Sequence, residues 1–122
     1  MTYPLERASA VAASRNRELN DAFRRADVLT ALTMGRRVDT SGVQSLPRDV
    51  VADIWREVVT YDQFNPDSDS RGEHDFGQID HPVAGRVFWK IERCEVSSAR
   101  GVGNQDELDA MRILTVMLAC ER

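Results

Sequence analysis

The sequence lacks the features of a membrane protein, of a thiolate metal site and of a secreted chain. Its two cysteines, Cys94 and Cys120, do not form a C-x-x-C pair, so they cannot build a thiolate zinc cage by themselves. No run approaches the roughly 20 apolar residues that a membrane helix needs. The apolar run 10–13 is too short for the hydrophobic region of a signal peptide. We therefore expect a cytoplasmic protein with reduced thiols and no membrane contact.

Positive charge is scarce in the middle of the chain. The 122 residues carry a net charge of −4. Between Glu57 and Asp80 there are seven acidic residues against Arg71 alone. A concentrated negative segment repels nucleic acid and favours cations or basic partners. Because the sequence also lacks a recognition-helix or zinc-finger pattern, direct nucleic-acid binding is not expected.

The common catalytic motifs are missing as well. The sequence has no nucleophile elbow, no Walker glycine loop and no dinucleotide-binding glycine pattern. A length of 122 residues is typical of one domain with one modest core. We therefore expect a single domain over residues 1–122 that is not an enzyme and carries no cofactor.

Two segments have the pattern of amphipathic helices. Residues 5–25 lack proline and glycine and place Leu19 and Phe23 on one face. In residues 47–61, apolar residues recur at helical spacing around Trp55, which we interpret as a core anchor. Pro47 suits a first helical turn, with Ser45 upstream as the expected cap.

The segment between these helices has two interpretations. Val28, Leu29 and Leu32 could extend the first helix as far as Gly35, a plausible stop. Residues 36–40 could then form a short strand.

The second half of the chain has the pattern of a sheet. Residues 75–80 and 86–95 predict an antiparallel hairpin joined by the sequence HPVAG, with Val87, Trp89 and Ile91 on one face. Residues 97–105 predict a loop. The final apolar run predicts either a buried helix or a short helix at 106–111 followed by a strand at 112–119. Its β-branched residues favour the strand.

Together these patterns predict an α+β fold, with two helices packed on one face of a small antiparallel sheet of about three to four strands. The predicted core consists of Phe23, Ile54, Trp55, Val58, Phe76, Val87, Trp89, Ile91, Ile113, Val116 and Leu118.

The stretch SDSRGEHDFGQIDH, residues 68–81, gathers histidines, carboxylates and glycines. A calcium loop starting at Asp67 would have Arg71 among its ligands, which repels the ion. His74 and His81 lie about 23 Å apart in an extended strand, too far to share a metal. An acid–base or metal centre at Glu73-His74-Asp75 is one interpretation that the sequence leaves open. The alternative is a structural turn, in which the glycines provide backbone freedom and the carboxylates accept backbone N–H bonds.

Several stretches resemble a known family in the same order along the chain. RNRELNDAFRR, GVQSL, GEHDFGQI, VFWKI and RILTVMLACE are similar to the bacterial domain of unknown function family 3768, over about residues 15–121. The resemblance implies a small protein of a kind often found on plasmids, phages and other mobile elements, and it brings no established activity. This chain differs from the family pattern at 68–71 and at 92–94.

From these observations we expect an acidic, non-enzymatic protein-binding module. The resemblance to a mobile-element family favours an inhibitor of a host defence complex, similar to anti-CRISPR proteins, whose carboxylates occupy a cationic nucleic-acid-binding surface. The candidate partner-binding residues are Asp62, Asp67, Asp69, Glu73, His74, Asp75 and Asp80. Two other hypotheses stay open: a regulatory module for an endogenous protein, and a metal-dependent enzyme centred on residues 73–75.

Overall fold

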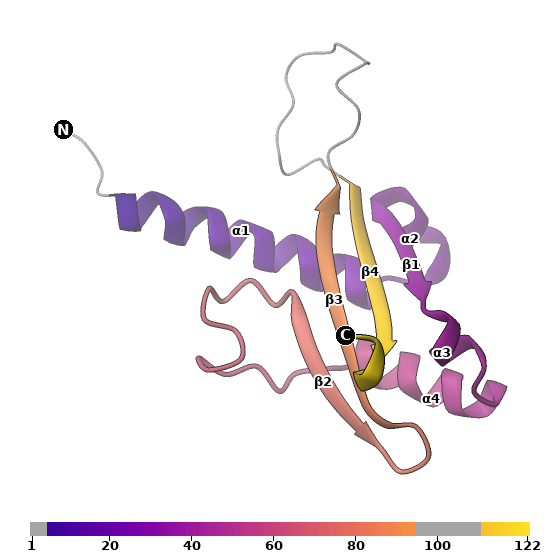
Figure 1. Cartoon of the computed structure of the whole chain (residues 1–122). Helices are drawn as coiled ribbons and strands as arrows, with labels where there is room; N and C mark the ends of the chain where they lie inside the picture. Colours follow the sequence, from indigo (N-terminus) through magenta and orange to yellow (C-terminus); the bar gives the residue numbers. More distant parts are fainter. Residues whose placement is uncertain (1–4, 95–110) are drawn as a thin grey trace.

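The computed structural model describes residues 5–94 and 111–122, and gives side chains from residue 10 onward. Its elements follow one another along the chain as drawn in Figure 1. They are α1 (Leu5–Arg25), α2 (Val28–Met34), β1 (Gly35–Asp39), α3 (Ser41–Gln44), α4 (Arg48–Val59), β2 (Phe76–His81), β3 (Gly85–Cys94), β4 (Met111–Leu118) and the 3-10 helix η3 (Ala119–Glu121).

The four strands form one sheet in the order β1-β4-β3-β2. Strands β2, β3 and β4 are antiparallel neighbours, whereas β1 pairs with β4 in parallel. The predicted α+β class is confirmed, but the sheet is mixed and not purely antiparallel. Because β1 precedes β4 by the whole of α4 and the β2–β3 hairpin, no local sequence pattern indicates this pairing.

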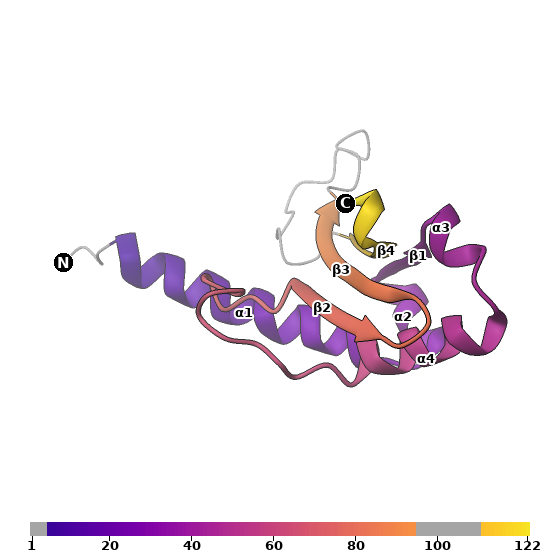
Figure 2. The same ribbon diagram turned by 60° about the horizontal axis from the view of Figure 1, so that its bottom comes forward.

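Helices α1, α2 and α4 lie on one face of the sheet, which Figure 2 shows as a layer below the strands. Helix α1 has the predicted bounds. Helix α2 is separate, because the side chain of Asp27 caps it by accepting from the Thr30 N–H at 2.7 Å. Helix α4 begins after Pro47 and ends at Val59, slightly shorter than predicted. The expected Ser45 cap is wrong, since its hydroxyl donates to the carbonyl of Gly42 at 2.7 Å.

The final apolar run is strand β4, which confirms the predicted strand and not the buried helix. Its last residues turn into η3, which packs near β3 on the face of the sheet away from the helices (Figure 1). The predicted loop at 97–105 and the short helix predicted at 106–111 lie outside the described residues, except for Met111, the first residue of β4. Among the described helices, none is long and apolar enough to cross a bilayer.

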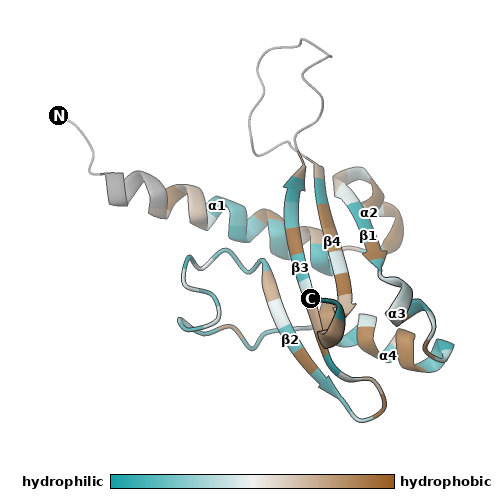
Figure 3. Cartoon of the chain, viewed as in Figure 1, coloured by the Kyte–Doolittle hydropathy of each residue, from teal (hydrophilic) through white to brown (hydrophobic). Residues whose placement is uncertain are grey.

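The core lies between the helices and the inner face of the sheet. Val87, Trp89 and Ile91 of β3 are buried there, as predicted, and they pair with Leu118, Val116 and Leu114 of β4. Figure 3 shows hydrophobic segments on the central strands and on α4, and a hydrophilic loop before β2. Buried hydrophobic residues that were not predicted are Ala31, Val43, Val50, Ile79, Phe88, Leu114 and Met117.

Four predicted core residues are only partly buried. They are Trp55, Phe76, Ile113 and Leu118. Phe76 lies on the outer face of the sheet, where its ring stacks against Phe88 at 5.6 Å and the guanidinium of Arg122 covers both rings. Ile113 alternates with the buried Arg112 and Leu114, so it is on that outer face too. The side chains of β4 therefore alternate between the two faces of the sheet. Its apolar run is so continuous that the sequence does not show which residues face the core.

Two arginines bind the C-terminal ends of helices α4 and α1. Arg24 is fully buried and donates to the carbonyls of Val58 and Val59 at 2.8 and 3.1 Å, at the end of α4. Arg37 donates to the carbonyls of Phe23, Arg24 and Ala26 at the end of α1. Burial lowers the pKa of both guanidinium groups. A positive charge at a helix C-terminus is favourable, because it meets unpaired carbonyls and the negative end of the dipole.

Candidate functional site

The GEHDFG segment is anchored to helix α1 by side-chain amides. The Asn16 amide donates to the Glu73 carboxylate at 3.1 Å, and the Asn20 amide donates to the Glu73 carbonyl at 2.9 Å. Arg17 donates to the carbonyl of Gly72 at 3.2 Å. Both asparagines are buried. Glu73 is therefore a partner of α1 and not part of an open acidic surface.

Arg112 of β4 fixes these amides from the sheet side. Its Nε donates to Asn20 Oδ1 at 2.9 Å and its Nη2 to Asn16 Oδ1 at 3.4 Å. Only 2% of Arg112 is exposed. Since each amide oxygen faces the guanidinium, each amide nitrogen must face the loop. The loop, α1 and β4 are thus linked through one buried polar network.

His74 is held within this network on several sides. Its Nδ1 lies 3.0 Å from the Asp21 carboxylate, and its Nε2 lies 3.7 Å from the Asp69 carboxylate. The ring stacks on Phe64 with the centroids 3.8 Å apart and the planes 4° apart. The backbone of His74 has φ of 53°, a left-handed conformation that histidine adopts more often than most residues. These contacts are those of a structural histidine.

Asp69 organises the turn that precedes His74. Its carboxylate accepts the backbone N–H groups of Glu73 and His74 at 3.1 and 3.2 Å, and only 6% of its side chain is exposed. Gly72 has φ of 69°, so glycine is the residue that fits this turn most easily. The prediction that carboxylates cap backbone N–H groups here is confirmed for Asp69.

Gly77 has a different role from the one predicted. Its backbone does not need a positive φ. It pairs with Trp89 across β2 and β3, and an added Cβ would lie 2.2 Å from Trp89 Nε1. Gly77 is therefore needed because the Trp89 ring approaches the backbone closely.

The second histidine closes the β2–β3 turn, where the HPVAG connection was expected. His81 Nδ1 accepts the N–H groups of Val83 and Ala84 at 3.0 and 3.2 Å. The proton must therefore be on Nε2, which lies 3.5 Å from the Asp53 carboxylate. Bonds from Arg56 and His81 hold the pKa of Asp53 below its usual value.

The described side chains do not support a metal centre at the histidines. The two nitrogens of His74 face different carboxylates on opposite sides of the ring, so those ligands do not converge on one point. Within residues 10–94 and 111–122, no group of three or more His, Cys, Asp or Glu side chains is arranged to hold a metal ion.

The structure separates the candidate partner-binding residues into two groups. Asp69, Glu73, His74 and Asp75 lie between α1 and the start of β2, where all are at least partly buried. Asp62, Asp67 and Asp80 are exposed. The acidic segment is therefore not one continuous surface.

The surroundings of Asp75 disfavour the charged form of its carboxyl. Its carbonyl continues the sheet by accepting the Ile91 N–H at 2.8 Å. Burial, together with the negative charges of Glu73 and Asp69, raises the pKa of the Asp75 carboxyl.

Asp62 and Asp80, but not Asp67, line a groove between α4 and β2, which we call the acidic groove. It has a volume of about 320 Å³. Its lining consists of Glu57, Thr60, Tyr61, Asp62, Gln63, Gln78, Ile79 and Asp80. Strand β2 is at the edge of the sheet, and the Gln78 N–H reaches the Tyr61 hydroxyl at 3.4 Å. Glu57 was not among the candidate site residues, although it belongs to the acidic segment.

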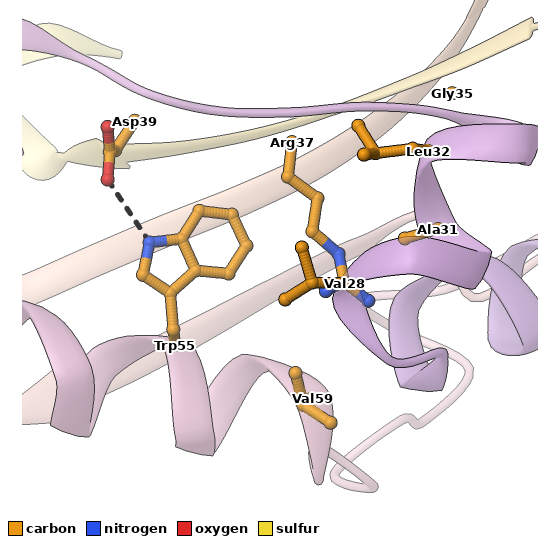
Figure 4. Close-up of a pocket in the computed structure, with 8 residues that line it drawn as sticks. All are labelled: Val28, Ala31, Leu32, Gly35, Arg37, Asp39, Trp55 and Val59. Carbon is orange, nitrogen blue, oxygen red and sulfur yellow. Dashed lines mark hydrogen bonds between the residues drawn. The ribbon is translucent and has the colours of Figure 1, made fainter.

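A second, apolar groove lies between α2, β1 and α4 and has a volume of about 390 Å³. Figure 4 shows Val28, Leu32 and Val59 around it, with Arg37 and Trp55 between them. The Trp55 indole donates to the Asp39 carboxylate at 3.2 Å. Trp55 is thus a wall of this groove as well as a neighbour of the core. Nothing in the apolar periodicity of α4 indicates that its tryptophan meets a groove.

Comparison with known proteins gives one family assignment. The profile of the protein of unknown function family DUF3768 matches residues 39–121. The chain belongs to the DUF3768 family. No curated protein and no solved structure matches it significantly.

The matched DUF3768 range contains α4, the GEHDFG segment and strands β2 to β4, and with them the whole acidic groove. It starts at the last residue of β1 and leaves out α1, which supplies Asn16 and Asn20. The family match therefore covers the loop but not the helix to which the loop is anchored.

Proposed function

We propose that this DUF3768 protein is a non-enzymatic protein-binding module that holds a basic segment of a partner in its acidic groove. The observation that carries the proposal is the position of Glu57, Asp62 and Asp80, which line one groove at an open edge of the sheet. Carboxylates around a groove strengthen the local field and attract cationic groups. Asp80 also contacts Arg86 at 3.1 Å, and that exposed pair can exchange for a partner's arginine at small cost.

The absence of an enzymatic role is part of this proposal and rests on the histidines. His74 faces the carboxylates of Asp21 and Asp69, and His81 binds the backbone of its own turn. Each ring nitrogen is therefore engaged within the fold. A His74→Ala variant with unchanged partner binding and lower stability is the expected result.

The proposed partner is a cytoplasmic, nucleic-acid-binding defence complex, in which the carboxylates of the groove take the place of phosphates. Support comes from the charge of the groove and from the mobile-element setting that the family resemblance implies. The lysines and arginines of a channel that binds phosphates can also bind carboxylates, if the carboxylates are spaced like the phosphates. An endogenous basic protein is the alternative partner, favoured if no defence subunit binds.

The test is affinity capture from lysate of a host that carries defence systems, with elution by a salt step and identification by mass spectrometry. The variant E57Q/D62N/D80N removes the groove charges. The control variant E18Q/D49N/E92Q removes the same number of exposed charges elsewhere. We expect the parent protein and the control to capture a basic protein that salt releases, and the groove variant to lose it.

Two results would contradict this function. Capture that is unaffected by the groove variant would exclude the acidic groove as the binding site. Turnover of a substrate that is abolished by His74→Ala, in a variant that remains folded, would exclude a non-enzymatic role.

A further inference from the structure

Strand β1 leaves one edge of the sheet open. Among the described strands, β4 is its one neighbour. The Thr40 N–H donates to the carbonyl of Val116 in β4 at 3.1 Å. Because the backbone groups of successive strand residues point to alternate sides, the N–H and C=O of Arg37 point away from β4. The N–H of Asp39 also points outward, and its carbonyl accepts from the Gln44 amide at 2.7 Å. Such an edge is a template for another strand.

Apolar side chains surround this edge. Val38 on β1 is 44% exposed, and on α2 the exposed fractions are 69% for Val28, 77% for Leu29 and 53% for Leu32. Helix α2 buries only Ala31. A seven-residue helix has little stability of its own, and yet this one presents most of its large apolar side chains to solvent. Patches of this kind mark sites of protein association.

We propose that β1 pairs with β1 of a second copy, in antiparallel orientation, so that the two sheets become one of eight strands. A two-fold axis through the strand makes the contact isologous, with the same surface used by both copies. This inference concerns the opposite edge of the sheet from the acidic groove, and it does not depend on the proposed function.

The charges of β1 select the register. Arg37 and Asp39 face the helix side of the sheet, where both line the apolar groove. An axis at Arg37 would place two arginines opposite each other. An axis at Val38 places Arg37 opposite Asp39 of the second copy, twice, and Val38 opposite itself on the outer face. Arg37 already donates to carbonyls at the end of α1, and the Asp39 carboxylate already accepts from Trp55, so each would meet the other copy's charge as an additional neighbour. Two like charges directly opposite each other are unfavourable, and the register centred on Val38 is the one that avoids them.

The same register places the exposed side of α2 against the second copy. Helix α2 directly precedes β1, whereas α3 directly follows it. In an antiparallel pair, the start of each β1 lies beside the end of the other. Leu29 and Leu32 of one copy are therefore near the α3–α4 corner of the second copy, at the end of the groove where Asp39 binds Trp55. The contact thus extends beyond the two strands.

Disulfide trapping tests the register directly. The exposed native cysteines are first removed as C94S/C120S, and Val38→Cys is then introduced. Two residues facing each other in a non-hydrogen-bonded pair have Cα atoms about 4.5 Å apart, which is within the range of disulfides. We expect Val38→Cys to form a covalent dimer at least about tenfold faster than a collisional control, because pairing raises the effective concentration. The matched control is Val83→Cys, at a site that is 65% exposed on the β2–β3 turn.

Light scattering on the reduced parent protein provides the second measurement. We expect a dimer whose population rises with concentration and falls in Leu29→Glu, while Val83→Glu has no effect. Equal trapping rates for Val38→Cys and Val83→Cys, or a parent protein that is monomeric at millimolar concentration, would overturn the proposal. Faster trapping between Arg36→Cys and Val38→Cys chains than between two Val38→Cys chains would overturn the register, since that pair meets when the axis is at Arg37.

Discussion

The two tryptophans should contribute unequally to the free energy of unfolding. Trp89 is fully buried and makes edge contacts with Tyr61 and Phe64 at 5.3 and 6.1 Å. Trp55 is partly exposed in the wall of the apolar groove. We expect Trp89→Ala to cost about 3–5 kcal/mol and Trp55→Ala roughly 1–3 kcal/mol, because less apolar area is lost. Urea titration of the two variants measures both costs, and equal losses would contradict this assignment.

Asp75 should make stability depend on pH in a direction opposite to that of most carboxylates. Its pKa is raised in the folded protein by burial and by Glu73. Folding therefore favours the protonated form. The stabilising contribution is complete below the unfolded-state pKa and is lost as the pH rises through the folded-state pKa. At neutral pH the charged carboxylate destabilises the fold.

Asp75→Asn tests this direction, because the amide is neutral at every pH. We expect the variant to have a higher Tm than the parent at pH 7 and nearly the same Tm at pH 3. Asp67→Asn is the control, since Asp67 is an exposed carboxylate of the same loop. Thermal unfolding followed by circular dichroism at both pH values gives the comparison. A variant that is less stable than the parent at pH 7 would show that the carboxylate is favourable there.

At the scale of elements, the docking of the 69–75 loop on α1 should depend on Asn20. This amide bonds to Glu73 on one side and to Arg112 on the other. Asn20→Ala leaves buried polar groups without these bonds, and we expect a loss of about 1–3 kcal/mol. Glu18→Ala, on the exposed side of α1, should change stability little.

Hydrogen exchange distinguishes a local from a global effect of Asn20→Ala. We expect the amides of Glu73 and His74 to lose protection first, because Asp69 binds them in the docked loop. Uniform loss of protection over β3 and β4 as well would mean that the network supports the whole fold and not the loop alone.

The elements that the sequence predicts well are those whose pattern is local. Helix α1 and strand β3 follow from apolar periodicity, and the stop at Gly35 is a short-range signal. The Asp27 cap that separates α2 from α1 was not predicted. The parallel pairing of β1 with β4 depends on residues about 77 apart. The docked loop depends on Asn16, Asn20 and Arg112, which hydropathy assigns to the surface. Polar residues that are buried because they satisfy one another give no periodic signal, and so the sequence alone places Glu73 in an open acidic surface.

At the scale of the whole molecule, the two sheet edges have different chemistry. The β2 edge adjoins the acidic groove, whereas the β1 edge adjoins exposed aliphatic side chains together with Arg37 and Asp39. Pairing of two β1 strands would place the two acidic grooves at opposite ends of one continuous sheet. The distance between them means that a ligand in one groove does not contact the other, so the grooves should act independently.

Calorimetry on the disulfide-trapped Val38→Cys dimer tests this independence. With a short arginine-rich peptide as the probe, we expect two peptides per dimer and one affinity, equal to that of the Leu29→Glu monomer. That affinity should fall with increasing salt, because the interaction is between exposed charges. It should also fall in E57Q/D62N/D80N. A stoichiometry of one peptide per dimer would mean that the pairing covers a groove or that the two grooves form one site. Either explanation contradicts an arrangement with the grooves at opposite ends of the sheet.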